Sequence, residues 1–366
     1  MSITKSKFFR IYLLPGFVFQ SIVIAGGYGT GRELVEFFLN FGTVGGLLGM
    51  WLVTAVIWGA VMAISFEFAR VFKVYDYRSF FKKLLGPGWV VYEILYLLLL
   101  FIVLAVVGAA AGSIMEETFG IPYLVGMIIM LAAVGVLAYR GSEAIAGFLS
   151  WWSFVLYAMY FLFIIMAFSS FGSDIMANLA QGEIKPGWAL GGFQYALYNL
   201  GVLPGVLFVL NSIENRCQAV VSGFAASAIA IIPGFLFYLA LAGGYPDVLQ
   251  VSVPALFLLN KIGALFLLTL FQVVLFGTLI ETGTGFIHAV NERIQSVYDE
   301  QRREMATWIR PAVAVVLLVF SAGLATFGLV DLIAKGYGTI CWGFFVVHII
   351  PIITIGVVKI KQAADQ

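Results

Sequence analysis

The chain has 366 residues, of which 62% are hydrophobic and 11% are charged, and its mean hydropathy is +1.04. Soluble proteins carry roughly 25% charged residues, so the composition excludes a soluble multidomain protein and indicates a polytopic α-helical membrane protein. Ten spans of about 20 residues would use roughly 200 residues, which leaves short loops and a single transmembrane domain over 1–366. The net charge is +1, and the basic residues form no patch, so we expect a lipid bilayer and no nucleic acid as partner.

Windows of about 19 residues predict ten apolar spans. In chain order they cover about 11–39, 43–70, 88–115, 122–139, 144–168, 193–211, 218–242, 255–290, 311–331 and 336–358. Aromatic and basic residues over 75–85 predict a short interfacial helix. Residues 169–192 are expected to form the longest outer loop, and 292–310 a charged helical extension of the eighth span followed by a turn.

The basic residues test this count, because cytoplasmic loops of membrane proteins are enriched in Lys and Arg. With both termini in the cytoplasm, 16 of the 20 basic residues fall on the inner side. Lys185, Lys261 and Lys335 fall on the outer side, and Arg32 lies within the first span. With nine or eleven spans, the inner and outer basic residues would no longer separate by side. We therefore expect a multi-pass protein of an inner membrane with cytoplasmic N- and C-termini.

Two interruptions divide the chain into similar halves. The first span contains AGGYGTGRE over 25–33 and the sixth contains YNLGVLPG over 198–205, an offset of roughly 174 residues. Because five spans per half is an odd number, the second half must enter the membrane from the opposite side. The pattern predicts an all-α fold of ten transmembrane helices in a 5+5 inverted repeat, about 11–168 and 193–358, with helices 1 and 6 broken.

Three segments carry a resemblance to a known family: 26–33, ETGTG over 281–285, and HAVNER over 288–293. On these motifs and the ten spans, the chain resembles the YkvI-type bacterial membrane proteins, which are related to the LeuT-fold transporters of the amino acid–polyamine–cation superfamily. The resemblance covers nearly the whole chain and implies a LeuT-like fold and transport across a bacterial plasma membrane. The chain departs from the family at two positions. Family members carry Gln at the position of Arg32, and they often carry Gln at the position of Glu281.

Broken helices expose backbone groups that need partners inside the bilayer. Half-helix N-termini suit an anionic group such as a carboxylate, and facing carbonyls suit Na⁺ or an ammonium. We therefore predict that a small-molecule substrate contacts Gly26, Gly27, Gly29, Thr30, Gly31, Asn199, Gly201 and Gly205. The alternative for the glycines is close helix packing.

Arg32 and Glu33 follow the first break, and a charge at that depth needs a partner or water. In one interpretation the two residues form an outer gate, and Arg32 resembles the arginine found after the break in LeuT-type symporters. A second has Arg32 contact an acidic substrate. The third is a structural ion pair of Arg32 with Glu33, Glu36 or an outer acid such as Asp331 or Asp247.

Glu281 lies deep in the eighth predicted span near three threonines. In cation symporters of the resembled fold, hydroxyl groups of this span face carbonyls of the first span and hold Na⁺. The resemblance therefore implies cation or proton coupling at Ala25, Thr278, Glu281, Thr282 and Thr284. Glu281 favours H⁺, because a buried carboxyl can take up and release a proton, and the threonines favour Na⁺. The structural alternative is a hydrated Glu281 paired with Arg293.

Cys217 and Cys341 lie in different apolar segments and predict neither a disulfide framework nor a metal site. No nucleophile–base pair is evident at membrane depth, so we expect no enzyme, no catalytic residues, and no cofactor or metal beyond a coupling Na⁺. The sequence predicts a secondary active transporter of a small polar solute, an amino acid or related amine, coupled to Na⁺ or H⁺ by alternating access. The alternatives are a passive channel or uniporter and a membrane sensor without transport. No sequence feature indicates the oligomeric state.

Overall fold

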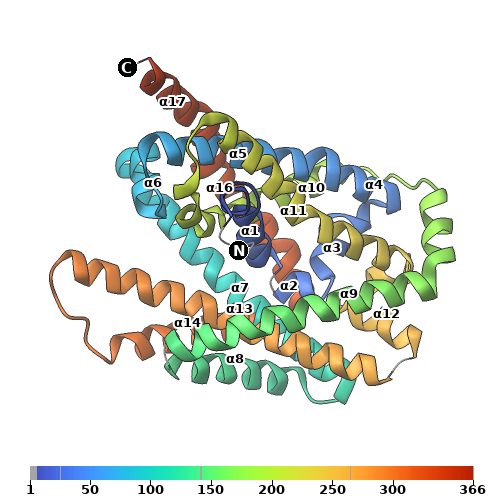
Figure 1. The fold of residues 1–366 in the computed structure, drawn as a ribbon. Helices are drawn as coiled ribbons and strands as arrows, with labels where there is room; N and C mark the ends of the chain where they lie inside the picture. Colours follow the sequence, from blue (N-terminus) through green and yellow to red (C-terminus); the bar gives the residue numbers. More distant parts are fainter. Residues whose placement is uncertain (1–5, 25, 141, 264, 366) are drawn as a thin grey trace.

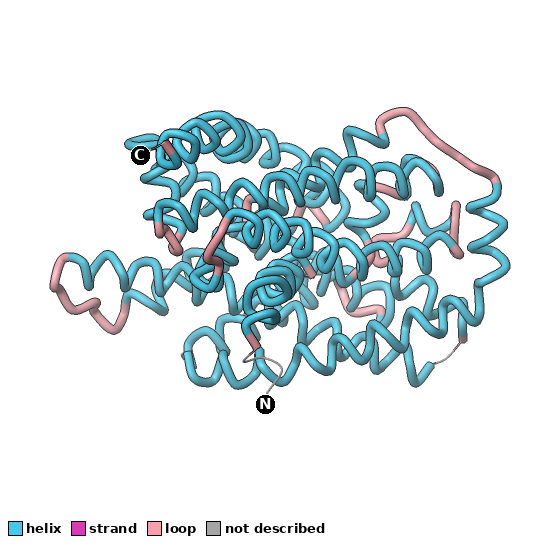
Figure 2. Tube along the Cα trace, turned by 45° about the horizontal axis from the view of Figure 1, so that its top comes forward, coloured by secondary structure: helices cyan, strands magenta, loops and turns pink. Residues whose placement is uncertain are grey.

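The computed structural model describes residues 6–365 except 25, 141 and 264, and all regular elements of these residues are helices (Figures 1 and 2). The elements up to residue 180 are η2 (Phe9–Leu13), α1 (Leu14–Val23), α2 (Gly26–Gly29), α3 (Arg32–Phe37), η3 (Leu39–Phe41), α4 (Thr43–Leu48), η4 (Gly49–Thr54), α5 (Ala55–Phe72), α6 (Tyr77–Leu85), η5 (Gly86–Gly88), α7 (Trp89–Phe119), α8 (Tyr123–Arg140) and α9 (Ser142–Ala180). The remaining elements are α10 (Trp188–Leu200), η6 (Leu203–Ser212), α11 (Arg216–Ala242), η7 (Asp247–Gln250), α12 (Pro254–Ile262), α13 (Leu265–Glu300), α14 (Ile309–Ala325), α15 (Leu329–Asp331), η8 (Leu332–Tyr337), α16 (Gly338–Phe344), η9 (Phe345–Ile349), η10 (Ile352–Gly356) and α17 (Val357–Ala364).

Length and apolarity make many of these helices membrane spans. Among the described residues, six helical segments are long and apolar enough to cross a bilayer, and the bent pair α10 and η6 makes a seventh. Large hydrophobic side chains such as Ile128 of α8 and Val319 and Phe320 of α14 remain exposed. Exposure of this kind suits a lipid-facing surface, because hydrocarbon rather than water then surrounds these side chains. The chain is an integral multi-pass membrane protein.

The helices form two groups with the N-terminal segments between them. In Figure 1, α8, α9, α13 and α14 lie together on one side of the molecule, and α4, α5, α10 and α11 lie on the other. The segments α1, α2 and α3 run between the groups, where α1 packs on α11 and α2 contacts α7 and α13. The first span is therefore enclosed by other helices, which places its break at the centre of the protein.

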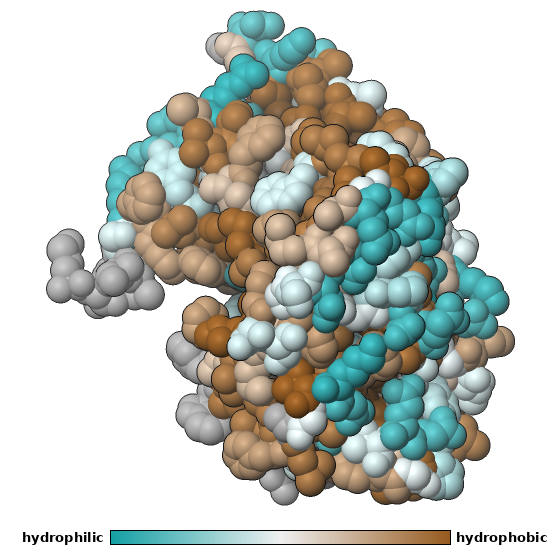
Figure 3. Space-filling model, turned by 90° about the vertical axis from the view of Figure 1, so that its right-hand side faces the viewer, coloured by the Kyte–Doolittle hydropathy of each residue, from teal (hydrophilic) through white to brown (hydrophobic). Residues whose placement is uncertain are grey.

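Polar contacts gather at the two ends of the long helices. One end, here called the terminal face, carries the ion pairs Lys7–Glu214 at 2.8 Å and Arg70–Glu67 at 2.7 Å, and Lys359 donates to the carbonyl of Lys83. The other end, the opposite face, carries Glu36, Glu183, Asp247 and Lys335. Figure 3 shows hydrophilic side chains in a band beside a broad hydrophobic surface.

Two segments differ from the sequence-based expectation. The expected loop over 169–192 is largely helical, because α9 continues past a non-helical Phe171 to Ala180 and leaves a connection of 181–187. Asn178 holds this extension by donating to the carbonyls of Ala242 and Tyr245. The expected span over 255–290 is divided, because α12 ends at Ile262, Gly263 follows with φ +74°, and α13 begins at Leu265.

Two other segments are helical, as expected. Residues 77–85 form α6, whose first turn is capped by the Asp76 carboxylate accepting from the Ser79 N–H at 2.8 Å. Its apolar side, with Phe80, Phe81 and Leu84, is buried. The charged extension of the eighth span is also helical, since α13 runs to Glu300 before a turn.

Candidate functional site

The first span is broken where the glycines predict it. Helix α1 ends at Val23, and the next residue, Ile24, leaves helical geometry with ψ 68°. The short helix α2 follows, and Gly31, with φ +81°, turns the chain into α3. A positive φ of this size favours glycine because it has no Cβ. Ala25 lies outside the described residues, and Gly26 and Gly27 are described only as backbone of α2.

The sixth span is also broken. Helix α10 ends at Leu200, η6 begins at Leu203, and the two are bent by 62°. Pro204 lies at the start of η6, where a missing N–H breaks no helical hydrogen bond. The two predicted glycines on either side of the turn face different neighbours. A Cβ on Gly201 would lie 2.7 Å from the Phe344 ring, whereas one on Gly205 would lie 2.6 Å from Cδ1 of Ile22 in α1.

A cavity of about 310 Å³ lies between the two breaks and the long helices α9 and α13. Three of the predicted site residues line this cavity: Gly205 of η6, and Glu281 and Thr282 of α13. Its other lining residues are Ser21, Ile22, Ile24, Tyr96, Leu156, Tyr157, Val202, Gly285, Phe286 and Ala289. The lining is mostly apolar with a few polar groups, the usual character of a small-molecule site.

A second cavity of about 580 Å³ continues from the first toward the terminal face. The two cavities share Tyr96, Gly205 and Ala289, and the second reaches Glu93 and Arg293. There Arg293 of α13 donates to the Glu93 carboxylate of α7 at 2.8 and 3.0 Å. The two cavities are therefore neighbours, and the second lies beside α6 on the side of the terminal face.

Toward the opposite face, Arg32 joins α3 to the segment after α11. Its Nη2 lies 2.6 Å from Glu36, one turn along α3, and its Nη1 donates to the carbonyls of Leu249 and Val251 at 3.0 and 3.2 Å. The carbonyl of Thr30 also accepts from the Ala255 N–H at 3.0 Å. Of the partners considered for Arg32, the structure has Glu36. The packing of Arg32, which is 4% exposed, closes this side of the first break.

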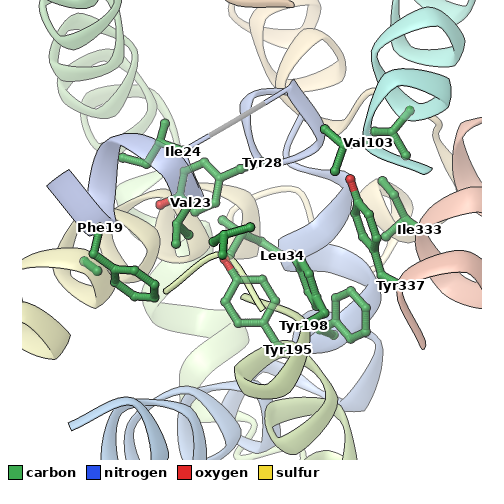
Figure 4. Close-up of a cluster of buried hydrophobic side chains, with 14 of the residues drawn as sticks. Phe19, Val23, Ile24, Tyr28, Leu34, Val103, Tyr195, Tyr198, Ile333 and Tyr337 are labelled. Atoms are coloured by element: carbon green, nitrogen blue, oxygen red, sulfur yellow. The ribbon is translucent and has the colours of Figure 1, made fainter. Parts of the chain in front are cut away.

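Glu33 turns to the other broken helix. It is 3% exposed and accepts a short hydrogen bond from the Tyr198 hydroxyl, near the end of α10. The Tyr198 ring stacks on Tyr337 of η8, with centroids 4.5 Å apart and planes at 9°. Figure 4 shows Leu34 of α3, Tyr195 and Tyr198 of α10 and Tyr337 of η8 in this buried cluster.

The other predicted residues are buried near the breaks without lining the cavity. Gly29 packs on Leu275 and Tyr160, and Asn199 donates to the Tyr195 carbonyl at 3.0 Å. The Thr278 hydroxyl donates to the Val274 carbonyl of its own helix at 2.9 Å. Thr284 is fully buried, and its hydroxyl has no partner among the described residues.

Sequence analysis missed several aromatic residues of the site. Tyr96 and Tyr157 line the cavity, and Tyr198 and Tyr337 cover Glu33. Their position within predicted spans was a usable signal, because tyrosines of membrane proteins concentrate at the interfaces and one inside a span needs a polar partner.

The fold, with two broken helices around a central cavity, is that of the LeuT-fold membrane transporters. A Na⁺-coupled sialic acid symporter has a TM-score of 0.57 and 13% identity over 94% of this chain and 87% of its own. MhsT in complex with L-phenylalanine has a TM-score of 0.51 and 17% identity over 95% and 98%. A manganese transporter mutant of Eremococcus coleocola has a TM-score of 0.54 and 15% identity over 96% and 80%.

In sequence, the chain is 25% identical over 293 residues to the uncharacterized membrane protein YkvI of Bacillus subtilis (strain 168). The alignment covers 76% of this chain and 80% of YkvI. No family model matches the chain. The resemblance to YkvI inferred from the sequence is confirmed, and so is the relation to LeuT-fold transporters.

Proposed function

We propose that this protein is a secondary active transporter of a small polar solute, an amino acid or a related amine, coupled to Na⁺ or H⁺. The observation that carries the proposal is the cavity at the two broken helices, with Glu281 and Thr282 in its wall. A carboxylate there suits the ammonium group of the solute or a cation. Backbone groups at helix breaks of this kind suit the polar remainder of the solute.

Alternating access is supported by the difference between the two ends of the site. The cavities lead to the terminal face, whereas Arg32 and its carbonyl partners pack together toward the opposite face. In the part of the chain that the structure describes, cavities lie on the side of the terminal face and packed side chains lie toward the opposite face, and this difference favours a transporter over an open channel. Structural neighbours that include a Na⁺-coupled symporter and a protein in complex with L-phenylalanine support the same class.

The proposed topology has ten spans in a 5+5 inverted repeat, with both termini in the cytoplasm. The proposed count is supported by three shorter apolar helices, Phe9–Val23, Tyr123–Ala138 and Ile309–Ala325, in addition to the six long segments and the bent pair. The proposal makes the terminal face cytoplasmic, in agreement with the distribution of basic residues. We propose transport as the activity in place of catalysis, in a bacterial plasma membrane.

Thermal unfolding of the purified protein in detergent, with a panel of amino acids and amines in Na⁺ or K⁺ buffer, tests the function. A ligand that binds the folded state raises the unfolding temperature with its concentration relative to its Kd. We expect one solute class to stabilise the protein and to be taken up by proteoliposomes. Absence of both effects for the whole panel would remove the amino acid and amine assignment.

Two variants locate the binding. Thr282→Ala removes a hydroxyl from the cavity wall and is expected to reduce the ligand-induced shift. Thr269→Ala, on the same helix, is the matched control, because its exposed hydroxyl is bonded to the Leu265 carbonyl and lies outside the cavity wall. Equal shifts in the two variants would place the ligand outside this cavity.

A further inference from the structure

Glu33 is a buried carboxyl group for which the structure supplies no cation. The neighbouring guanidinium of Arg32 is directed to Glu36 and to two backbone carbonyls. Among the ion pairs of the described residues, none includes Glu33. An ionised carboxylate without a counter-charge is strongly disfavoured at such depth. The side chain therefore needs a bound proton or a bound cation.

The surroundings of Glu33 fit a proton better than a metal cation. On the neighbouring elements α2, α9, α10 and η8, the titratable groups of the described residues that interact with Glu33 are tyrosines, which are neutral: Tyr28, Tyr160, Tyr195, Tyr198 and Tyr337. The Tyr198 hydroxyl donates to the carboxyl group, and no other hydrogen bond to its side chain occurs among the described residues. Protein-bound metal cations take a shell of several oxygen ligands, whereas a proton requires only the carboxyl oxygen itself.

The position of Glu33 connects its protonation to the conformation of the protein. It lies on α3, after the first break, and its partner Tyr198 lies on α10, just before the second break. The stacked ring of Tyr337 covers Tyr198 from η8. A route from the opposite face to the breaks requires this aromatic cover to part, which would admit water to the carboxyl group.

We propose that Glu33 is a proton-binding residue whose protonation holds the opposite face closed. When that face opens, the carboxyl O–H bond breaks, the proton passes to water, and a hydrated carboxylate remains. A proton that binds one state more tightly than another shifts the equilibrium between them. The inference rests on the proposed transport function and names H⁺ as the ion to which alternating access responds.

Infrared spectroscopy of the full chain in lipid vesicles near neutral pH tests the protonation directly. We expect a C=O stretching band of a protonated carboxylic acid that is lost in Glu33→Gln. The matched control, Glu36→Gln, lies on the same helix beside Arg32 and should keep the band. Tyr198→Phe retains the acid and removes its donor, so the band should shift in frequency. Identical carboxylic acid bands in the wild type and Glu33→Gln would overturn the proposal.

Spin-label distances test the link to opening. Ala189→Cys on α10 and Lys335→Cys on η8 are both exposed, and the natural cysteines are replaced by Ser. Loss of one proton on opening should raise the ratio of open to closed protein by up to about tenfold per pH unit. We expect that slope in the wild type and in Glu36→Gln, and its loss in Glu33→Gln. An unchanged slope in Glu33→Gln would contradict the proposal.

The two proposals fail separately. Uptake of a solute without the band and without the pH slope would overturn the role of Glu33 and leave the transporter intact. The band and the slope without uptake of any solute in the panel would support the role of Glu33 and count against the proposed transport function.

Discussion

Single residues decide how the first span turns, and Gly31 is the clearest case. It joins α2 to α3 in the left-handed region, and directly after it Arg32 and Glu33 point toward different partners. Consecutive residues of an α-helix are rotated by about 100°, because 3.6 residues make one turn. The turn at Gly31 therefore sets which side chain reaches the carbonyls of Leu249 and Val251 and which reaches Tyr198.

Gly31→Ala is expected to destabilise the protein. The left-handed conformation costs an L-residue roughly 1–2 kcal/mol, and the new Cβ would lie 3.2–3.4 Å from Leu241 and Pro254. Thermal unfolding in detergent measures the effect. Gly323→Ala within α14 is the control, because no atom lies within 4 Å of its added Cβ, and alanine is favoured in a helix. Equal unfolding temperatures for the two variants would contradict the strain at Gly31.

At the scale of elements, the sequence predicted where the two helices break, but it did not predict which residues beside the breaks line the cavity. Glycine and proline clusters in apolar surroundings are local signals, so the turns at Gly31 and before Pro204 could be located in advance. Whether Gly201 or Gly205 lines the cavity depends on the 62° bend between α10 and η6, which local sequence does not encode. The helical end of α9 was missed for a related reason, since its polar residues are stabilised by tertiary hydrogen bonds such as that of Asn178.

The connection 181–187 is held at the opposite face by a polar cluster of Glu183, Lys185 and Tyr245. The Tyr245 hydroxyl donates to the Glu183 carboxylate, and the Lys185 ammonium lies 2.8 Å from the same hydroxyl. The hydrogen bond from Tyr245, aided by Lys185, lowers the pKa of Glu183. Because the pKa of Glu183 is lower in the folded protein than in the unfolded chain, its ionised carboxylate stabilises the folded connection at any pH above the unfolded-state pKa. This stabilisation is lost as the pH falls through the folded-state pKa of Glu183.

Acid is therefore expected to loosen this connection. Hydrogen exchange of the amides over 181–187 should accelerate in the wild type when the pH falls into the acidic range, after correction for the intrinsic exchange rate. Glu183→Gln should show fast exchange at neutral pH as well, because its charge is absent. Asp247→Asn, at the exposed ion pair with Lys261, is the control and should leave this segment unchanged. If the amides of 181–187 exchange at the same rate in Glu183→Gln and in the wild type at neutral pH, the polar cluster does not hold this connection in place.

At the scale of the whole molecule, access to the centre is asymmetric. Two cavities that share Tyr96, Gly205 and Ala289 reach the terminal face, while the contacts of Arg32 and the Glu33–Tyr198 pair lie on the other side of the breaks. An asymmetric site between two broken helices is what alternating access requires, since the reverse arrangement exposes the same site to the other side. The direction of opening and the topology can therefore be measured together.

Cysteine labelling with a membrane-impermeant maleimide makes that measurement in a Cys217→Ser background, where the remaining Cys341 is buried. Ala289→Cys lies in both cavities and should react in inside-out vesicles and be protected in right-side-out vesicles. Lys335→Cys, whose side chain is 77% exposed at the opposite face, should show the reverse pattern and serves as the control. Reaction of both positions from the same side of the membrane would contradict the proposed topology.

The same labelling tests whether the solute enters the cavity. A stabilising ligand should slow the labelling of Ala289→Cys and leave the labelling of Lys335→Cys unaffected. An unchanged labelling rate of Ala289→Cys in the presence of the ligand would show that the ligand binds outside this cavity.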